Sequence, residues 1–70
     1  MMTKIGICAG AVLLYLDRQE GEASVEELVS KIDTSREILM MAVGWLAREG
    51  YLLIEPDRYD FTVRLRSHKI

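Results

Sequence analysis

The chain has 70 residues, half of them hydrophobic and 29% charged, and its net charge at neutral pH is −2. This composition excludes a disordered or fibrous protein. The length allows one domain, which we expect to span residues 1–70, with a thin stability margin that dimerisation often widens. The negative charge argues against a protein whose main task is to grip phosphates. Cys8 is the single cysteine, which excludes an internal disulfide and a CxxC metal site and indicates the reducing cytoplasm.

The first expected element is a helix from about Thr3 to Arg18, because apolar residues recur there at helical spacing. Lys4 and the uncharged run after it, Ile5–Leu16, look like the start of a signal peptide, but no small-x-small cleavage site follows the run. The run is also shorter than the ~20 residues that a bilayer-spanning helix needs. We therefore expect neither export nor membrane insertion. The residues expected on the core face of this helix are Ile5, Cys8, Ala9, Val12, Leu13 and Leu16.

The opposite face of the same helix is as apolar as the core face, because no residue of the Ile5–Leu16 run is charged. A helix that is hydrophobic all round is normally buried all round, and one small domain cannot cover both sides. Gly6 and Gly10 each cost about 1 kcal/mol relative to alanine in a helix, and they permit close approach of another backbone. We therefore predict a two-fold homodimer whose interface contains Ile7, Ala11, Leu14 and Tyr15.

Two further helices are expected to follow the first. Ser24-Val-Glu-Glu27 is a capping-box pattern and predicts the start of a helix over Val25–Ile32. Thr34-Ser-Arg-Glu37 is a second such pattern and predicts a helix that continues to Glu49, with Gly50 as its left-handed C-terminal cap. Two helices separated by a turn of three or four residues are typical of a helix-turn-helix.

The third helix is expected to bury the face that contains Trp45, which would pack against the first helix and Phe61. Leu39, Met40 and Val43 would then lie on the outward face. The residues that share the expected inner face are Ile38, Met41, Ala42, Trp45, Leu46 and Glu49.

After Gly50 the apolar period changes from 3.6 to 2 residues, which predicts two strands, Tyr51–Glu55 and Tyr59–Arg66, joined by a turn at Pro56-Asp57. One face of the second strand should pack on the helices and the other should be exposed to solvent. The residues expected on the packed face are Tyr59, Phe61, Val63 and Leu65. Three helices followed by a hairpin form a winged helix-turn-helix, a mostly α fold with a small β-hairpin wing (α+β).

Three segments of the chain resemble one family. They are Ile5-Gly6-x-x-Ala9-Gly10-x-Val12-x-x-x-Leu16, Ser24-Val-Glu-Glu-Leu28 and Gly44-Trp-Leu-Ala-Arg-Glu-Gly50, of which the last is the most specific. Together they are similar to a small bacterial and archaeal group of stand-alone winged helix-turn-helix proteins, long carried as a domain of unknown function. The resemblance implies this fold and a role in DNA binding or transcription control. It implies no catalytic residue and no ligand.

The residues themselves also offer no catalytic or metal site. A nucleophile needs a base within hydrogen-bond reach, and the single histidine, His68, lies near the C-terminal end of the sequence. Cys8 lies on the apolar face of the first helix, where an inert buried thiol is expected. Gly6-Ile-Cys-Ala-Gly10 lies inside a helix and lacks the spacing of a phosphate loop. We therefore expect no enzyme and no cofactor.

Duplex DNA is the first candidate partner, because the second helix of a helix-turn-helix reads the major groove with its N-terminal residues. The residues expected at the groove are Ser35, Arg36, Glu37 and Met40. Of these, Arg36 could hold guanine in a bidentate contact and Glu37 could accept from cytosine. The residues expected at phosphates are Ser35, Arg48, Arg58, Arg64, Arg66 and Lys69. Because these positive charges are few, we expect weak DNA binding. We therefore predict a homodimeric transcription regulator that binds DNA weakly.

A protein is the alternative partner. Leu39, Met40 and Val43, expected on the outward face of the third helix, suit a protein contact better than a row of phosphates, and methionine is enriched in protein interfaces. On this interpretation the chain is a protein–protein interaction module that uses the apolar surface of the first or the third helix. A third interpretation is that some of these side chains simply complete the core against the wing.

Overall fold

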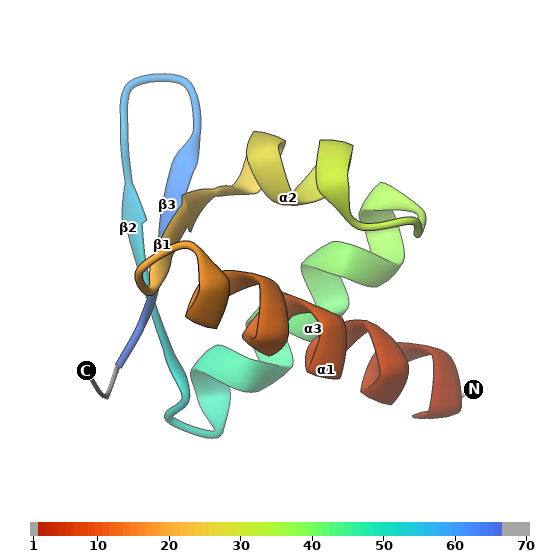
Figure 1. The fold of residues 1–70 in the computed structure, drawn as a ribbon. Coiled ribbons are helices and arrows are strands. Elements are labelled where there is room, and N and C mark those ends of the chain that lie inside the picture. Colours follow the sequence, from red (N-terminus) through yellow and green to blue (C-terminus); the bar gives the residue numbers. More distant parts are fainter. Residues whose placement is uncertain (1, 67–70) are drawn as a thin grey trace.

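The computed structural model describes residues 2–66, with side chains from Lys4 onward, so His68 and Lys69 lie outside the described residues. Residues 2–66 form three helices and three strands (Figure 1). Their bounds are α1 Met2–Arg18, β1 Glu22–Ser24, α2 Val25–Lys31, α3 Arg36–Arg48, β2 Leu52–Pro56 and β3 Phe61–Leu65. The strands form one antiparallel sheet in the order β1-β3-β2. This arrangement confirms the predicted winged helix.

Strand β1 was not predicted from the sequence. It has three residues, too few for an alternating pattern to be visible, and it forms because its backbone pairs with β3, with Ala23 opposite Val63. Its Ala23 side chain is buried in the core. The pairing makes β3 the central strand of the sheet and connects the end of α1 to the wing.

The helix ends follow local capping chemistry. The Ser24 hydroxyl accepts a hydrogen bond from the Glu27 N–H at 3.0 Å, as predicted for the start of α2. At the start of α3 the cap is Ser35 rather than Thr34, because the Ser35 hydroxyl accepts from the Ile38 N–H at 3.1 Å. Gly50, with φ of 87°, closes the other end of α3 in the left-handed conformation that glycine favours.

The predicted inner face of α3 is correct for Ala42 and Leu46 and wrong for Met41 and Trp45. The buried residues of this helix are Leu39, Ala42, Val43 and Leu46, whereas Trp45 and Met41 are 43% and 55% exposed. Both faces have the spacing of an amphipathic helix, so periodicity alone does not separate them. The contact with α1 distinguishes the two faces, because α1 presents a buried face that consists of Cys8, Ala9, Val12 and Leu16. We infer that this surface of small and aliphatic side chains favours the compact aliphatic face of α3 over the indole.

The wing is also less packed than predicted. Strand β3 begins at Phe61 rather than Tyr59, and Val63 is its only fully buried residue. Phe61 is exposed and does not form the expected contact with Trp45 inside the core, and Tyr59 is 94% exposed. The reason is visible in Figure 1, where the hairpin rises beyond the helices, so its tip has no layer to pack against.

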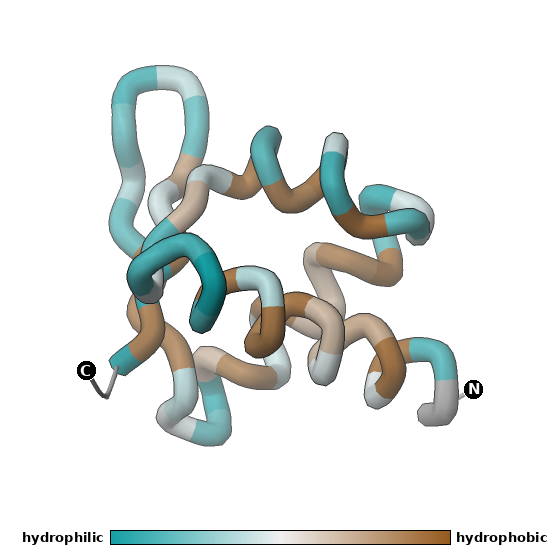
Figure 2. Tube along the Cα trace, viewed as in Figure 1, coloured by the Kyte–Doolittle hydropathy of each residue, from teal (hydrophilic) through white to brown (hydrophobic). Residues whose placement is uncertain are grey.

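The core lies where α1, α3 and the inner face of the sheet meet, and α2 covers one side of it. Figure 2 shows hydrophilic segments gathered at the wing tip and after α1, while α1 is pale or brown between its ends. Among the described residues, no helix combines the length and the apolar character that crossing a membrane requires.

Candidate nucleic-acid interface

The start of α3 exposes the residues that the sequence predicted for base reading. Ser35, Arg36 and Glu37 are all exposed in the first turn. The Arg36 guanidinium is not free, however, because its Nη1 lies 2.9 Å from Oε2 of Glu26, in the first turn of α2. Both side chains are more than half exposed, so the pair contributes little to stability, about 0–1 kcal/mol, and a phosphate could compete for the guanidinium.

The wing turn contacts the first turn of α2, which also holds the partner of Arg36. The turn is closed by a hydrogen bond from the Asp57 N–H to the Asp60 carbonyl at 2.8 Å, and Asp57 Oδ1 accepts from the Arg58 N–H. Asp60 Oδ2 in turn accepts from the N–H of Glu26 at 3.4 Å. Glu26 therefore contacts both Arg36 and the wing, and it brings the two predicted contact regions together. This role of Glu26 was not predicted, because nothing in its position along the sequence indicates a contact with Arg36 or with the wing.

The other arginines predicted to contact phosphates differ in whether a carboxylate already pairs with the guanidinium. Arg64 lies between two carboxylates across the sheet, with Glu22 at 3.3 Å and Glu55 at 3.2 Å. Arg48, Arg58 and Arg66 are exposed, and within residues 2–66 none of them forms an ion pair. These three arginines are therefore available to phosphates, whereas Arg64 is held in a network of its own.

The exposed stripe of α3 carries few charges. Glu37 stands at one end and Arg48 at the other, both exposed. The exposed residues between them are Met40, Met41, Gly44 and Trp45. Met40 is thus outward as predicted, but Leu39 and Val43 are buried, which corrects the expectation that they formed part of this surface. The stripe can give apolar contacts and only one guanidinium at its far end.

The residues predicted for the dimer interface divide into two pairs. Ile7 and Leu14 are 69% and 54% exposed on the side of α1 that faces away from the core. Ala11 and Tyr15 are partly buried. The Tyr15 hydroxyl donates a hydrogen bond to the Glu27 carboxylate, which joins α1 to α2.

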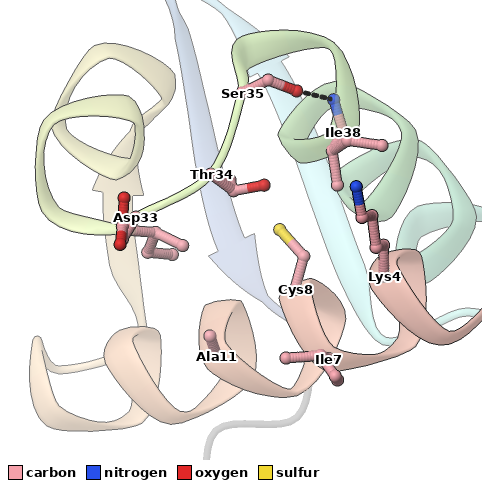
Figure 3. Close-up of a pocket in the computed structure, with 9 residues that line it drawn as sticks. Lys4, Ile7, Cys8, Ala11, Asp33, Thr34, Ser35 and Ile38 are labelled. Carbon is pink, nitrogen blue, oxygen red and sulfur yellow. Dashed lines mark hydrogen bonds between the residues drawn. The ribbon is translucent and has the colours of Figure 1, made fainter.

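A groove of about 570 Å³ runs between α1 and the turn that precedes α3 (Figure 3). The Cys8 thiol points into it toward Thr34, and burial raises the pKa of Cys8 above its ordinary value although a hydrogen bond with Thr34 opposes the shift. The raised pKa favours the protonated thiol over the nucleophilic thiolate. In the part of the chain that the structure describes, no three His, Cys, Asp or Glu side chains are arranged to hold a metal.

The Tyr15–Glu27 hydrogen bond predicts a stability change at high pH. The bond raises the pKa of Tyr15, with smaller contributions from burial and from the charge of Glu27. A raised folded-state pKa stabilises the fold below the ordinary value of 10.0, and this contribution is lost as pH rises through the folded value. The parent should therefore lose more thermal stability than Tyr15→Phe between pH 9 and 11, measured by circular dichroism. Equal losses would contradict the bond.

Comparison with known proteins agrees with the architecture. The family model described as "Winged helix-turn-helix domain (DUF2582)" matches residues 1–65. The uncharacterized protein MJ1608 of Methanocaldococcus jannaschii is 33% identical over 67 residues, which cover 94% of this chain and 96% of that protein. No solved structure matches the chain. With three helices, a wing and a family model that covers nearly its whole length, the chain belongs to the winged helix-turn-helix family DUF2582.

Proposed function

We propose that this protein binds duplex DNA weakly, as a cytoplasmic homodimer, and regulates transcription. The observation that carries the proposal is the helix-turn-helix itself, with the start of α3 and the wing tip both in contact with Glu26. In helix-turn-helix proteins the second helix enters the major groove by its N-terminal residues. The free N–H groups and the dipole at that end also favour a phosphate.

The electrostatics of the surface support weak and sequence-tolerant binding. Arg48, Arg58 and Arg66 are the exposed arginines predicted at phosphates that form no ion pair among residues 2–66, and Arg36 has to exchange Glu26 for DNA. Because Glu37, Asp57 and Asp60 lie nearby, they repel phosphates and limit the affinity. Base reading by α3 would rest on Arg36 and on apolar contacts of Met40 with a thymine methyl group.

The test is the salt dependence of binding to a short random-sequence duplex, followed by fluorescence anisotropy. With about four to six phosphates neutralised per dimer, the slope of log affinity against log salt should be at most about −4 to −5. Arg58→Ala together with Arg66→Ala should weaken binding to all sequences and flatten the slope. Arg64→Ala should change the affinity and the slope little, because Glu22 and Glu55 already hold that guanidinium.

Arg18→Ala is the matched control, since it removes an exposed arginine from the end of α1, outside the start of α3 and the turn of the wing. If it weakens binding as much as the double variant does, the contact is a general charge effect. If the parent does not bind duplex DNA even at low salt, DNA is not the ligand.

The exposed stripe of α3 favours a second function, contact with another protein. Met41 and Trp45 lie where a DNA-reading helix usually offers hydrogen-bond donors, and both residue types are enriched in protein interfaces. Under this alternative the Arg58 and Arg66 substitutions are silent. Met41→Ser and Trp45→Ser should instead abolish capture of a partner that the parent retains.

A further inference from the structure

Two consecutive carboxylates in the first turn of α2 have different partners. Glu27 accepts a hydrogen bond from the Tyr15 hydroxyl and so joins α2 to α1. Glu26 instead pairs with Arg36 of α3, with its Oε2 2.9 Å from Nη1 of the guanidinium. Glu27 therefore supports the fold itself, whereas Glu26 stays more than half exposed and contacts a residue of the candidate DNA surface.

The backbone on both sides of this ion pair is held by capping contacts. The N–H groups of Glu26 and Glu27 donate to the Asp60 carboxylate at 3.4 Å and to the Ser24 hydroxyl at 3.0 Å. The Ser35 hydroxyl caps the start of α3 in the same way (Figure 3). The two side chains of the pair therefore extend from backbone positions that the fold fixes, and they meet in the protein without DNA.

The place of Arg36 in its helix favours an anionic partner. Arg36 is the first residue of α3, where the helix dipole disfavours a cation. Glu26 lies in the first turn of α2, where the dipole favours a carboxylate. Without DNA, Glu26 therefore occupies the place beside the guanidinium that a phosphate of DNA would otherwise take.

The exchange of one anion for another changes the free energy little. When a phosphate replaces Glu26 at Arg36, one exposed ion pair is lost as another forms, so Arg36 adds little affinity for an arbitrary sequence. A guanine edge differs from a phosphate, because it accepts two hydrogen bonds from one guanidinium where the other bases do not. Contact with guanine can therefore compensate for the loss of Glu26, and contact with a phosphate alone does not.

We propose that Glu26 is a specificity-determining residue of the DNA site, which keeps Arg36 from phosphates and releases it to guanine in the major groove. Glu26 acts through Arg36 and need not touch DNA, so it is a positioning residue. It lowers the affinity of the protein for all sequences and concentrates the base discrimination of a sequence-tolerant surface at the position that Arg36 reads. This role rests on the proposed DNA binding.

Glu26→Gln tests the role, because it removes the negative charge and keeps the size of the side chain. The affinity for a random-sequence duplex should rise by about two- to fivefold per copy, which corresponds to the loss of an exposed ion pair. The slope of log affinity against log salt should steepen by about 0.9 per copy, because Arg36 becomes a further phosphate contact. The gain should be smaller for a duplex that the parent enriches from a random pool, so discrimination falls. Thermal unfolding should be nearly unchanged.

The Arg36→Ala background shows whether the effect passes through Arg36. There Glu26→Gln should change the affinity and the slope much less. Asp33→Asn is the matched control, since Asp33 is exposed in the turn before α3 and its replacement removes the same charge but leaves the Glu26–Arg36 pair. It should give a similar small gain with and without Arg36. An equal gain from Glu26→Gln in both backgrounds would reveal a general repulsion of DNA and overturn the proposal.

The remaining outcomes distinguish this role from DNA binding as such. If the parent binds duplex DNA and Glu26→Gln binds no more tightly, or discriminates as well as the parent, the role of Glu26 is wrong and the proposed function stands. If neither protein binds at low salt, both are wrong. Binding by Glu26→Gln alone would support the withholding of Arg36 and contradict weak DNA binding by the parent.

Discussion

Leu46→Ala is expected to lower the free energy of unfolding by about 2–5 kcal/mol, which is most of the stability of a domain this small. Leu46 is fully buried in the middle of the core, where α3 packs on α1. The substitution leaves a cavity that the surrounding aliphatic side chains can only partly fill. Urea denaturation followed by circular dichroism should show a folded baseline that is short or absent at room temperature.

Trp45→Ala is the informative comparison, because tryptophan is the larger residue and stands next to Leu46 in the chain. With 43% of its surface exposed, Trp45 loses less buried area on truncation, and alanine is also the better helix former. Its cost should be clearly smaller than that of Leu46→Ala in the same denaturation experiment. The opposite order would mean that α3 buries the indole face, as the sequence pattern alone predicted.

Val63→Asp should be still more damaging. Val63 is fully buried in the central strand, between Ala23 of β1 and Ile54 of β2. A carboxylate there has no partner, and burying an unpaired charge costs several kcal/mol. The protein should be largely unfolded at neutral pH by circular dichroism. Leu53→Asp is the control, since Leu53 lies in the adjacent strand but is exposed, and it should remain folded.

The defect of Val63→Asp should depend on pH in one direction. Burial raises the pKa of the introduced carboxyl group in the folded state, so the folded protein binds the proton more tightly than the unfolded chain. The loss of stability relative to the parent is then complete above the folded pKa and smallest below the ordinary aspartate value of about 3.9. A loss that stays constant from pH 7 to pH 4 would indicate that the carboxylate reaches solvent.

The local elements of the fold could be predicted because their causes lie within a few residues. Apolar spacing defined α1 and α3, and the Ser24 hydroxyl defined the start of α2. The sequence also predicted the hairpin of the wing, but Pro56 ends β2 opposite Phe61 and the turn is formed by residues 57–60 rather than by Pro56-Asp57. Capping hydrogen bonds and turn chemistry join neighbours in the chain. For the same reason the sequence also indicated an apolar face on α1 that its own core would not cover, although the partner for that face stays a prediction.

Contacts between residues distant in the chain were decided only by the tertiary structure. Strand β1 exists because it pairs with β3, and the buried face of α3 was chosen by the side chains that α1 presents. The tertiary structure also decided which arginines of the candidate DNA surface are unpaired, since Arg36 pairs with Glu26 and Arg64 with Glu22 and Glu55. An arginine in a sequence is a possible phosphate ligand. Whether its guanidinium is free depends on carboxylates that folding brings within about 4 Å, a distance at which opposite charges attract appreciably.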